Sequence, residues 1–180
     1  MRCSIIVELQ GVLGKPLYTT FTKLVNVCNG RIRTFNQETN EFLIILNHNL
    51  KKNVCPQIND IINLCNYCLG FVRLHIVIEN DDDKNRVLKL ARSRGELVKA
   101  YDGYRFIVKY GKHNVIGLYN LKRNVVSLYV VNKPVEKFKL MLMSVNEIHD
   151  YVITNCSTEV FKEHYSTLRA LCNEFLIGSP

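Results

Sequence analysis

The chain has 180 residues, of which 47% are hydrophobic and 22% charged, and its formal net charge is +8. This composition suits one compact domain, or two fused halves that share a core. No apolar run approaches the roughly 20 residues that a membrane-spanning helix needs, and the first ten residues lack the features of a signal peptide. We therefore expect no membrane partner and an intracellular location, either cytoplasmic or organellar.

The seven cysteines are odd in number and irregular in spacing. In a chain without a secretion signal, this pattern predicts buried thiols that act as small hydrophobic side chains. Cys65 and Cys68 have the spacing of a redox or zinc pair, but a zinc site needs two further ligands. Only Cys55 lies near, and the segment IINLCNYCLGF is apolar nearly throughout. We expect packing there, with neither a metal nor a cofactor.

Positive charge is concentrated in one part of the sequence. Residues 84–139 contain 14 Lys or Arg and 3 Asp or Glu, a balance of +11, whereas the remainder has a balance of −3. A segment with this excess favours a polyanionic partner, and nucleic acid is the commonest one. The alternative is an ordinary solvated surface that keeps the protein soluble.

In the first part of the chain, apolar periodicity and turn residues predict alternating strands and helices. Residues 17–28 have helical spacing, and the helix is expected to end at Asn29-Gly30. The elements predicted here are a strand at 3–9, this helix, strands at 31–35 and 41–47, and a helix at 57–69 that Gly70 ends.

The second part begins with a strand at 72–79, followed by a helix that Asn80 or Asp81 caps and Gly95 ends. Strands at 96–101 and 104–110 are joined at Asp102-Gly103, a strong signal for a tight hairpin. The later elements are a segment at 113–124 that fits either a helix or a strand, a strand at 125–131, an edge strand within 133–143, and helices at 145–155 and 157–176. Ser144 and Glu147 predict a capping box for the first of these helices.

Two segments share one order of elements. Residues 24–46 and 88–108 both consist of a helix end, a glycine, a strand, a polar turn and a second strand, and each follows a strand and a helix. We therefore predict two βαββ units, at about 3–47 and 72–110. The expected fold is α+β, with duplicated βαββ units forming an antiparallel sheet, helices packed on one face, and two C-terminal helices. The regions are 1–70, 71–143 and 144–180, which together form one compact domain.

The other face of this sheet is expected to be open. Side chains alternate along a strand, so Arg105, Ile107 and Lys109 point to one side. We expect one face to present Lys99, Arg105 and Lys109, with Tyr101 or Ile107 between them. Basic side chains can bind phosphates and planar ones can contact bases or sugars, which would make a nucleic-acid saddle. The alternative is a half-buried sheet with a hydrated polar face.

The stretch LHIVIENDDDKNRVLKLARSRGELVKAYDGYRFIV, and more faintly the first unit, resembles the core of LAGLIDADG homing endonucleases. That resemblance implies a basic antiparallel sheet laid along a nucleic-acid groove, and several members of the family act on RNA as splicing cofactors. The family's signature helix ends in residues that supply a metal-binding carboxylate. The corresponding residues here, 69–73, contain no acid, so the resemblance implies a binding or structural descendant rather than a nuclease.

An acidic run follows the strand at 72–79. Asp81, Asp82 and Asp83 could hold Mg²⁺ for phosphoryl chemistry, or they could cap the helix and complement its dipole. Capping is the simpler explanation. His75 has no second histidine beside it, and no phosphate loop, GxGxxG or HExxH motif occurs.

The sequence therefore favours a non-catalytic nucleic-acid-binding protein, with RNA favoured over DNA, as a structural component of a ribonucleoprotein with other proteins. The alternatives are a divergent Mg²⁺-dependent endonuclease and an ACT-like regulatory module that binds a small molecule. The residues expected to contact nucleic acid are Lys84, Arg86, Lys89, Arg92, Arg94, Lys99, Tyr101, Arg105, Lys109, Lys112, Lys122 and Arg123.

Overall fold

A computed structural model describes residues 1–48, 50 and 53–177. The chain forms two compact units, which we name after the helices α1 (Tyr18–Val27) and α3 (Asp81–Arg94) that they contain. The α1 unit comprises Ser4–Val72 and Ile153–Tyr165, and the α3 unit comprises Met1–Cys3, Arg73–Val152 and the residues from Ser166 onward. Each unit is described by itself.

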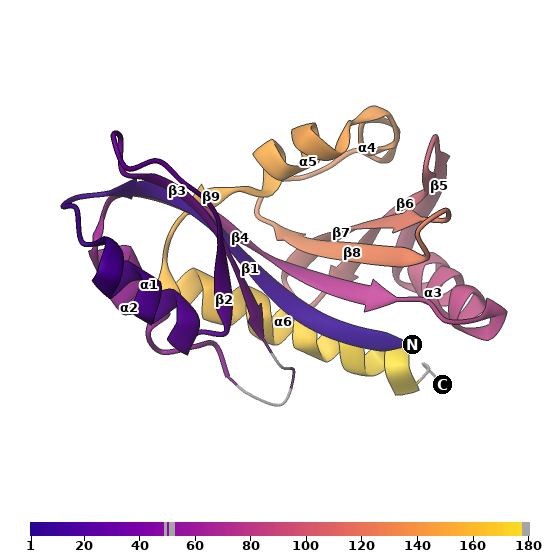
Figure 1. Cartoon of the computed structure of the whole chain (residues 1–180). Coiled ribbons are helices and arrows are strands. Elements are labelled where there is room, and N and C mark those ends of the chain that lie inside the picture. Colours follow the sequence, from indigo (N-terminus) through magenta and orange to yellow (C-terminus); the bar gives the residue numbers. More distant parts are fainter. Residues whose placement is uncertain (49, 51–52, 178–180) are drawn as a thin grey trace. The chain divides into compact units, whose positions relative to one another are not determined.

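The described residues form six helices and nine strands (Figure 1). The helices are α1 (Tyr18–Val27), α2 (Ile58–Asn63), α3 (Asp81–Arg94), α4 (Lys137–Leu142), α5 (Val145–Val152) and α6 (Thr158–Ile177). The strands are β1 (Arg2–Leu13), β2 (Gly30–Phe35), β3 (Glu41–His48), β4 (Cys65–Val77), β5 (Gly95–Ala100), β6 (Gly103–Tyr110), β7 (His113–Asn120), β8 (Val125–Val131) and β9 (Thr154–Asn155). The expected α+β fold is confirmed, with an antiparallel sheet, helices packed against it and two helices near the C terminus.

In the α1 unit the strand order is β2-β3-β1-β4, and β9 pairs with β4. Alternation along β1 and β3 buries one row of side chains from each strand, and helix α1 adds Phe21 and Val25 to the same core. The core residues from the two strands are Ile5, Val7, Leu9, Phe42, Ile44 and Leu46.

Residues 64–69, expected in a helix, instead lie in or beside β4, because an apolar run of this length suits a buried strand as well as a helix.

In the α3 unit the strand order is β4-β8-β7-β6-β5, all antiparallel where the register is defined. Both predicted βαββ segments are present, but their strands pair differently. In the first, β1 pairs directly with β3, whereas in the second β7 and β8 lie between β4 and β6. The ambiguous segment at 113–124 is therefore the strand β7 and its turn.

Helices lie on both sides of the strands in the α3 unit (Figure 1). Helix α3 contributes Val87, Leu90 and Ala91 to the core, and Asn80 caps it by accepting a hydrogen bond from the Asp83 N–H, as expected. The prediction of an edge strand within 133–143 is wrong, because this segment forms α4. The Glu136 carboxylate caps α4 by accepting hydrogen bonds from the N–H groups of Phe138 and Lys139. The capping box of α5 is confirmed by reciprocal hydrogen bonds between Ser144 and Glu147.

Six of the seven cysteines form disulfides, so the expectation of buried thiols is wrong for them. The pairs are Cys3–Cys172 in the α3 unit, and Cys28–Cys55 and Cys68–Cys156 in the α1 unit. The paired cysteines are 169, 27 and 88 residues apart, so their spacing does not indicate the pairing. Cys65 is free, and its thiol donates a hydrogen bond to the Ile61 carbonyl oxygen.

Candidate nucleic-acid interface

Five of the expected contact residues come from α3. Lys89 and Arg92 are exposed, whereas Lys84, Arg86 and Arg94 are half-buried. Arg86 donates a hydrogen bond of 2.9 Å to the carbonyl oxygen of Leu176 in α6, and Arg94 forms an ion pair with Glu174 of the same helix. Arg86 and Arg94 therefore help to fix α6 against α3, which leaves Lys89 and Arg92 as the exposed cations of this helix.

The other expected residues lie on strands β5 and β6 and on three turns. Lys99 and Lys109 are exposed on their strands, and Tyr101 is 74% exposed in the turn between them. Lys112 is exposed in the β6–β7 turn, and Lys122 and Arg123 are exposed in the β7–β8 turn. Arg105 differs from all of these, because its exposed fraction is 0%.

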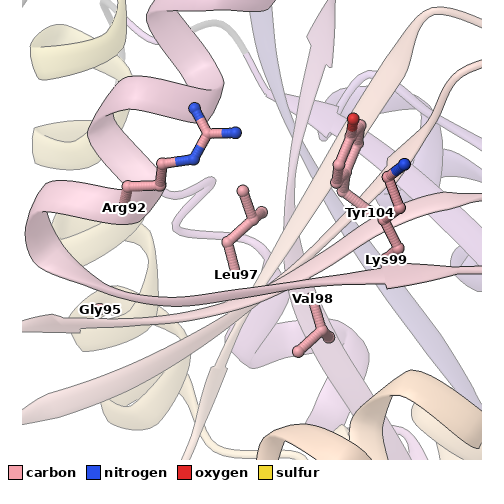
Figure 2. A pocket seen from close by; sticks show the side chains of 6 residues that line it. All are labelled: Arg92, Gly95, Leu97, Val98, Lys99 and Tyr104. Carbon is pink, nitrogen blue, oxygen red and sulfur yellow. The ribbon is translucent and has the colours of Figure 1, made fainter.

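The predicted saddle of Lys99, Arg105 and Lys109 is wrong, because the β5–β6 register places Lys99 on the other face. Lys99 pairs directly with Tyr104, and Val98 pairs directly with Arg105. Directly paired residues of antiparallel strands point to the same face. Figure 2 shows this division, with Lys99, Leu97 and Tyr104 on one side of the strands and Val98 on the other.

The face that carries Arg105 is also not open at that position. The Arg105 Nη1 donates hydrogen bonds of 3.0 Å to the carbonyl oxygens of Leu140 and Met143, at the end of α4. Its Nη2 lies 3.1 Å from the Asp102 Oδ2, and its Nε donates a longer bond of 3.4 Å to Oδ1. Helix α4 thus covers Arg105, and the guanidinium is neutralised inside the protein rather than available to a phosphate.

Arg105 and Asp102 instead shape the β5–β6 hairpin. Ala100 pairs with Gly103, so Tyr101 and Asp102 form a two-residue turn, one residue earlier than expected from Asp102-Gly103. The Arg105 guanidinium carbon lies 5.4 Å from the centre of the Tyr101 ring, within the range of a cation–π contact. One buried arginine therefore holds both residues of the turn.

Three of the exposed cations, Arg92, Lys99 and Lys122, line two adjoining hollows. The first has a volume of about 360 Å³ and is lined by Arg92, Gly95, Leu97, Val98, Lys99 and Tyr104 (Figure 2). The second has a volume of about 520 Å³ and extends along the hairpin turn to Asn120, Leu121 and Lys122. Lys99 and Tyr104 line both hollows, so we treat them as one surface and call it the hairpin groove.

The hairpin groove brings together only part of the predicted set. Four of the expected residues line it: Arg92, Lys99, Tyr101 and Lys122. Tyr104 also lines it and was missed, because alternation placed it on the side opposite Arg105, which was taken as the binding side. Arg94 and Lys109 line a separate hollow with Glu96. Lys84, Lys89, Lys112 and Arg123 line neither part of the groove.

The acidic run at the start of α3 is arranged as a helix terminus. Asp83 is buried and accepts a hydrogen bond from the Glu79 N–H, and its Oδ2 lies 3.1 Å from the N-terminal ammonium of Met1. Burial tends to raise the pKa of Asp83, but this hydrogen bond, the ammonium and Arg86 together hold the pKa below its usual value. Asp81 and Asp82 are exposed in the first turn. Across residues 1–48, 50 and 53–177, no group of three or more His, Cys, Asp or Glu could hold a metal ion.

No protein-family model, curated protein or solved structure matches the chain. Among the described residues, no helix is both long and apolar enough to span a membrane.

Proposed function

We propose that the α3 unit binds nucleic acid through the hairpin groove, without cleaving it, and that RNA is favoured over DNA. The observation that supports this most strongly is the gathering of Arg92, Lys99 and Lys122 around two adjoining hollows that also expose tyrosine side chains. At nucleic-acid-binding surfaces, cations commonly bind phosphates and aromatic rings contact bases. A structural role in a ribonucleoprotein follows as part of this proposal.

These three cations can meet phosphates in the hairpin groove. Within the described part of the chain they form no ion pair, whereas Arg94 and Arg105 are paired with Glu174 and Asp102. Neutralising a phosphate releases condensed counterions, so affinity falls as salt rises. Three phosphate contacts on a single strand predict a slope of about −2 for log K against log salt concentration.

Fluorescence anisotropy with labelled RNA and duplex DNA over a range of salt concentrations tests the proposal. We expect salt-sensitive binding that a triple variant, with Arg92, Lys99 and Lys122 each changed to Ala, weakens at least tenfold, as an order-of-magnitude expectation for lost phosphate contacts. The matched control removes three exposed cations of the α1 unit, Lys15, Lys23 and Arg31. Absence of salt-sensitive binding to either polymer, or equal weakening in the two triple variants, would contradict the proposal.

We also infer that the protein matures in an oxidising compartment rather than in the cytoplasm. Three disulfides support this, because thiols in the cytoplasm are kept reduced and structural disulfides persist in oxidising compartments. Non-reducing mass spectrometry of protein from its native source would show the three pairs intact. Recovery of seven free thiols there would contradict the inference.

A further inference from the structure

The strands around the hairpin groove leave little flat surface for a duplex. In the α3 unit, α3 packs on one face of the sheet, and α4 contacts β5 and β6 from the other. The accessible parts are therefore the β5 edge and the hairpin turn, which border the two hollows. A single strand can follow such a narrow border, whereas an A-form duplex is recognised over a broad face that spans its minor groove.

The hairpin turn presents one aromatic ring to solvent. Tyr101 is 74% exposed, although aromatic side chains are more often buried. The Arg105 guanidinium lies against its ring, 5.4 Å from the ring centre, so the cation covers one part of the ring and leaves the rest accessible. An accessible ring of this kind is a stacking platform for a nucleobase.

The turn that carries Tyr101 is fixed before any ligand binds. Asp102 is held by the buried Arg105, and its carbonyl oxygen accepts a hydrogen bond of 3.1 Å from the Leu121 N–H in the β7–β8 turn. Gly103 follows with a positive φ of 147°, and a Cβ there would meet the Tyr119 carbonyl oxygen at 2.2 Å. A preorganised platform loses little conformational entropy on binding, which favours a specific contact.

Two lysine side chains line the same hollow as the Tyr101 ring. Lys99 and Lys122 line it together with Tyr101, and its volume of about 520 Å³ lies within the range of about 300–1,000 Å³ that is usual for ligand sites. We propose that the hairpin groove binds an unpaired stretch of nucleic acid, with a base stacked on Tyr101 and flanking phosphates bound by Lys99 and Lys122. This inference rests on the proposed function and adds that the bound stretch is single-stranded.

The test compares a fluorescein-labelled 12-nucleotide single-stranded RNA with the same RNA annealed to its complement. We expect the single strand to bind more tightly at every salt concentration. Tyr101→Ala should weaken its binding about 5- to 150-fold, the range for loss of one base–aromatic stack, while leaving the salt slope unchanged because the lost contact is not ionic. Tyr101→Phe keeps the ring and should stay within about twofold of the native protein.

Tyr67→Ala is the matched control, because Tyr67 is also an exposed tyrosine, 53% accessible, but lies in the α1 unit. It should bind as the native protein does. Equal or tighter binding of the duplex, or unchanged binding by Tyr101→Ala, would overturn this inference while the proposed function stands. Absence of salt-sensitive binding to both forms would overturn both.

Discussion

The guanidinium of Arg105 lies 3.1 Å from the carboxylate of Asp102, three residues earlier, and no part of the arginine side chain reaches solvent. Two backbone carbonyl oxygens at the end of α4 accept its remaining hydrogen bonds. A residue expected to contact phosphates is therefore part of the interior. It joins the β5–β6 hairpin to the helix that covers it.

Replacing Arg105 with Ala should lower the free energy of unfolding by about 3–5 kcal/mol, because it leaves the Asp102 carboxylate and two carbonyl oxygens without their partner. Urea denaturation measures the change. Arg92→Ala is the control, since Arg92 is exposed on α3 and surface substitutions usually change stability by less than about 0.5 kcal/mol. Equal urea midpoints for the two variants would show that Arg105 is not buried as described.

The cysteine arrangement predicts a definite number of reactive thiols. Burial raises the pKa of the Cys65 thiol to about 11, so roughly 0.1% of it is thiolate at pH 8. In the folded, unreduced protein, iodoacetamide should label Cys65 slowly and no other cysteine. After unfolding without reductant, mass spectrometry should find one rapidly labelled thiol, and after reduction seven. More than one labelled thiol in the unfolded, unreduced protein would contradict the three pairings.

His48 should make the stability of the α1 unit depend on pH. Its Nε2 accepts a hydrogen bond from the Cys55 N–H, which requires a neutral ring, and burial lowers its pKa, opposed in part by the carbonyl of Leu46. Because the folded pKa is the lower one, the unfolded chain binds more protons below about pH 6.5. The free energy of unfolding should therefore fall as pH decreases from 6.5 through the folded pKa.

The measurement is urea denaturation between pH 7.5 and pH 5, comparing the native protein with His48→Gln. The native protein should lose more stability over this range than the variant, which has no group to titrate at this position. Parallel pH profiles would contradict the assignment of a neutral, hydrogen-bonded His48. A histidine NMR titration that gives His48 a pKa at or above 6.5 would contradict it as well.

Lys99 and Lys109 provide a paired test of the two sheet faces. Both are exposed lysines on neighbouring strands, but Lys99 lines the hairpin groove and Lys109 lines the separate hollow beside Glu96. Lys99→Glu should weaken RNA binding about tenfold at low salt, because it replaces a phosphate contact with a repulsive charge. Lys109→Glu makes the same change in net charge and should weaken binding much less. Anisotropy titrations measure both, and equal effects would mean that net charge alone drives binding.

Much of the fold could be predicted because local patterns agree with the tertiary structure. The Asn80 cap and the capping box of Ser144 and Glu147 depend on residues only three apart, and both are present. The helix at α1 and the strands β2 and β3 follow from apolar periodicity and glycine turns. Helix α4 was missed because Glu136, its capping residue, lies within a run that alternates like a strand.

The candidate site was harder to predict, because it depends on pairing between strands. A two-residue turn always pairs an odd-numbered residue with an even-numbered one, so Lys99 had to share a face with Tyr104 and could not share one with Arg105. The sequence contains this information in the short turn itself. The burial of Arg105 depends in addition on α4, which reaches the hairpin from more than 30 residues further along the chain. Alternation along one strand shows neither relationship.

The most direct test of nucleic-acid binding at the hairpin groove is a ¹⁵N heteronuclear NMR titration of the whole protein with single-stranded RNA. We predict that amide signals of β5, of the turn at Tyr101–Asp102 and of the β7–β8 turn at Lys122 shift together with added RNA. Signals of α1 and β2 in the α1 unit should stay in place. Shifts that appear mainly in the α1 unit, or no shifts at low salt, would contradict the hairpin groove as a nucleic-acid interface.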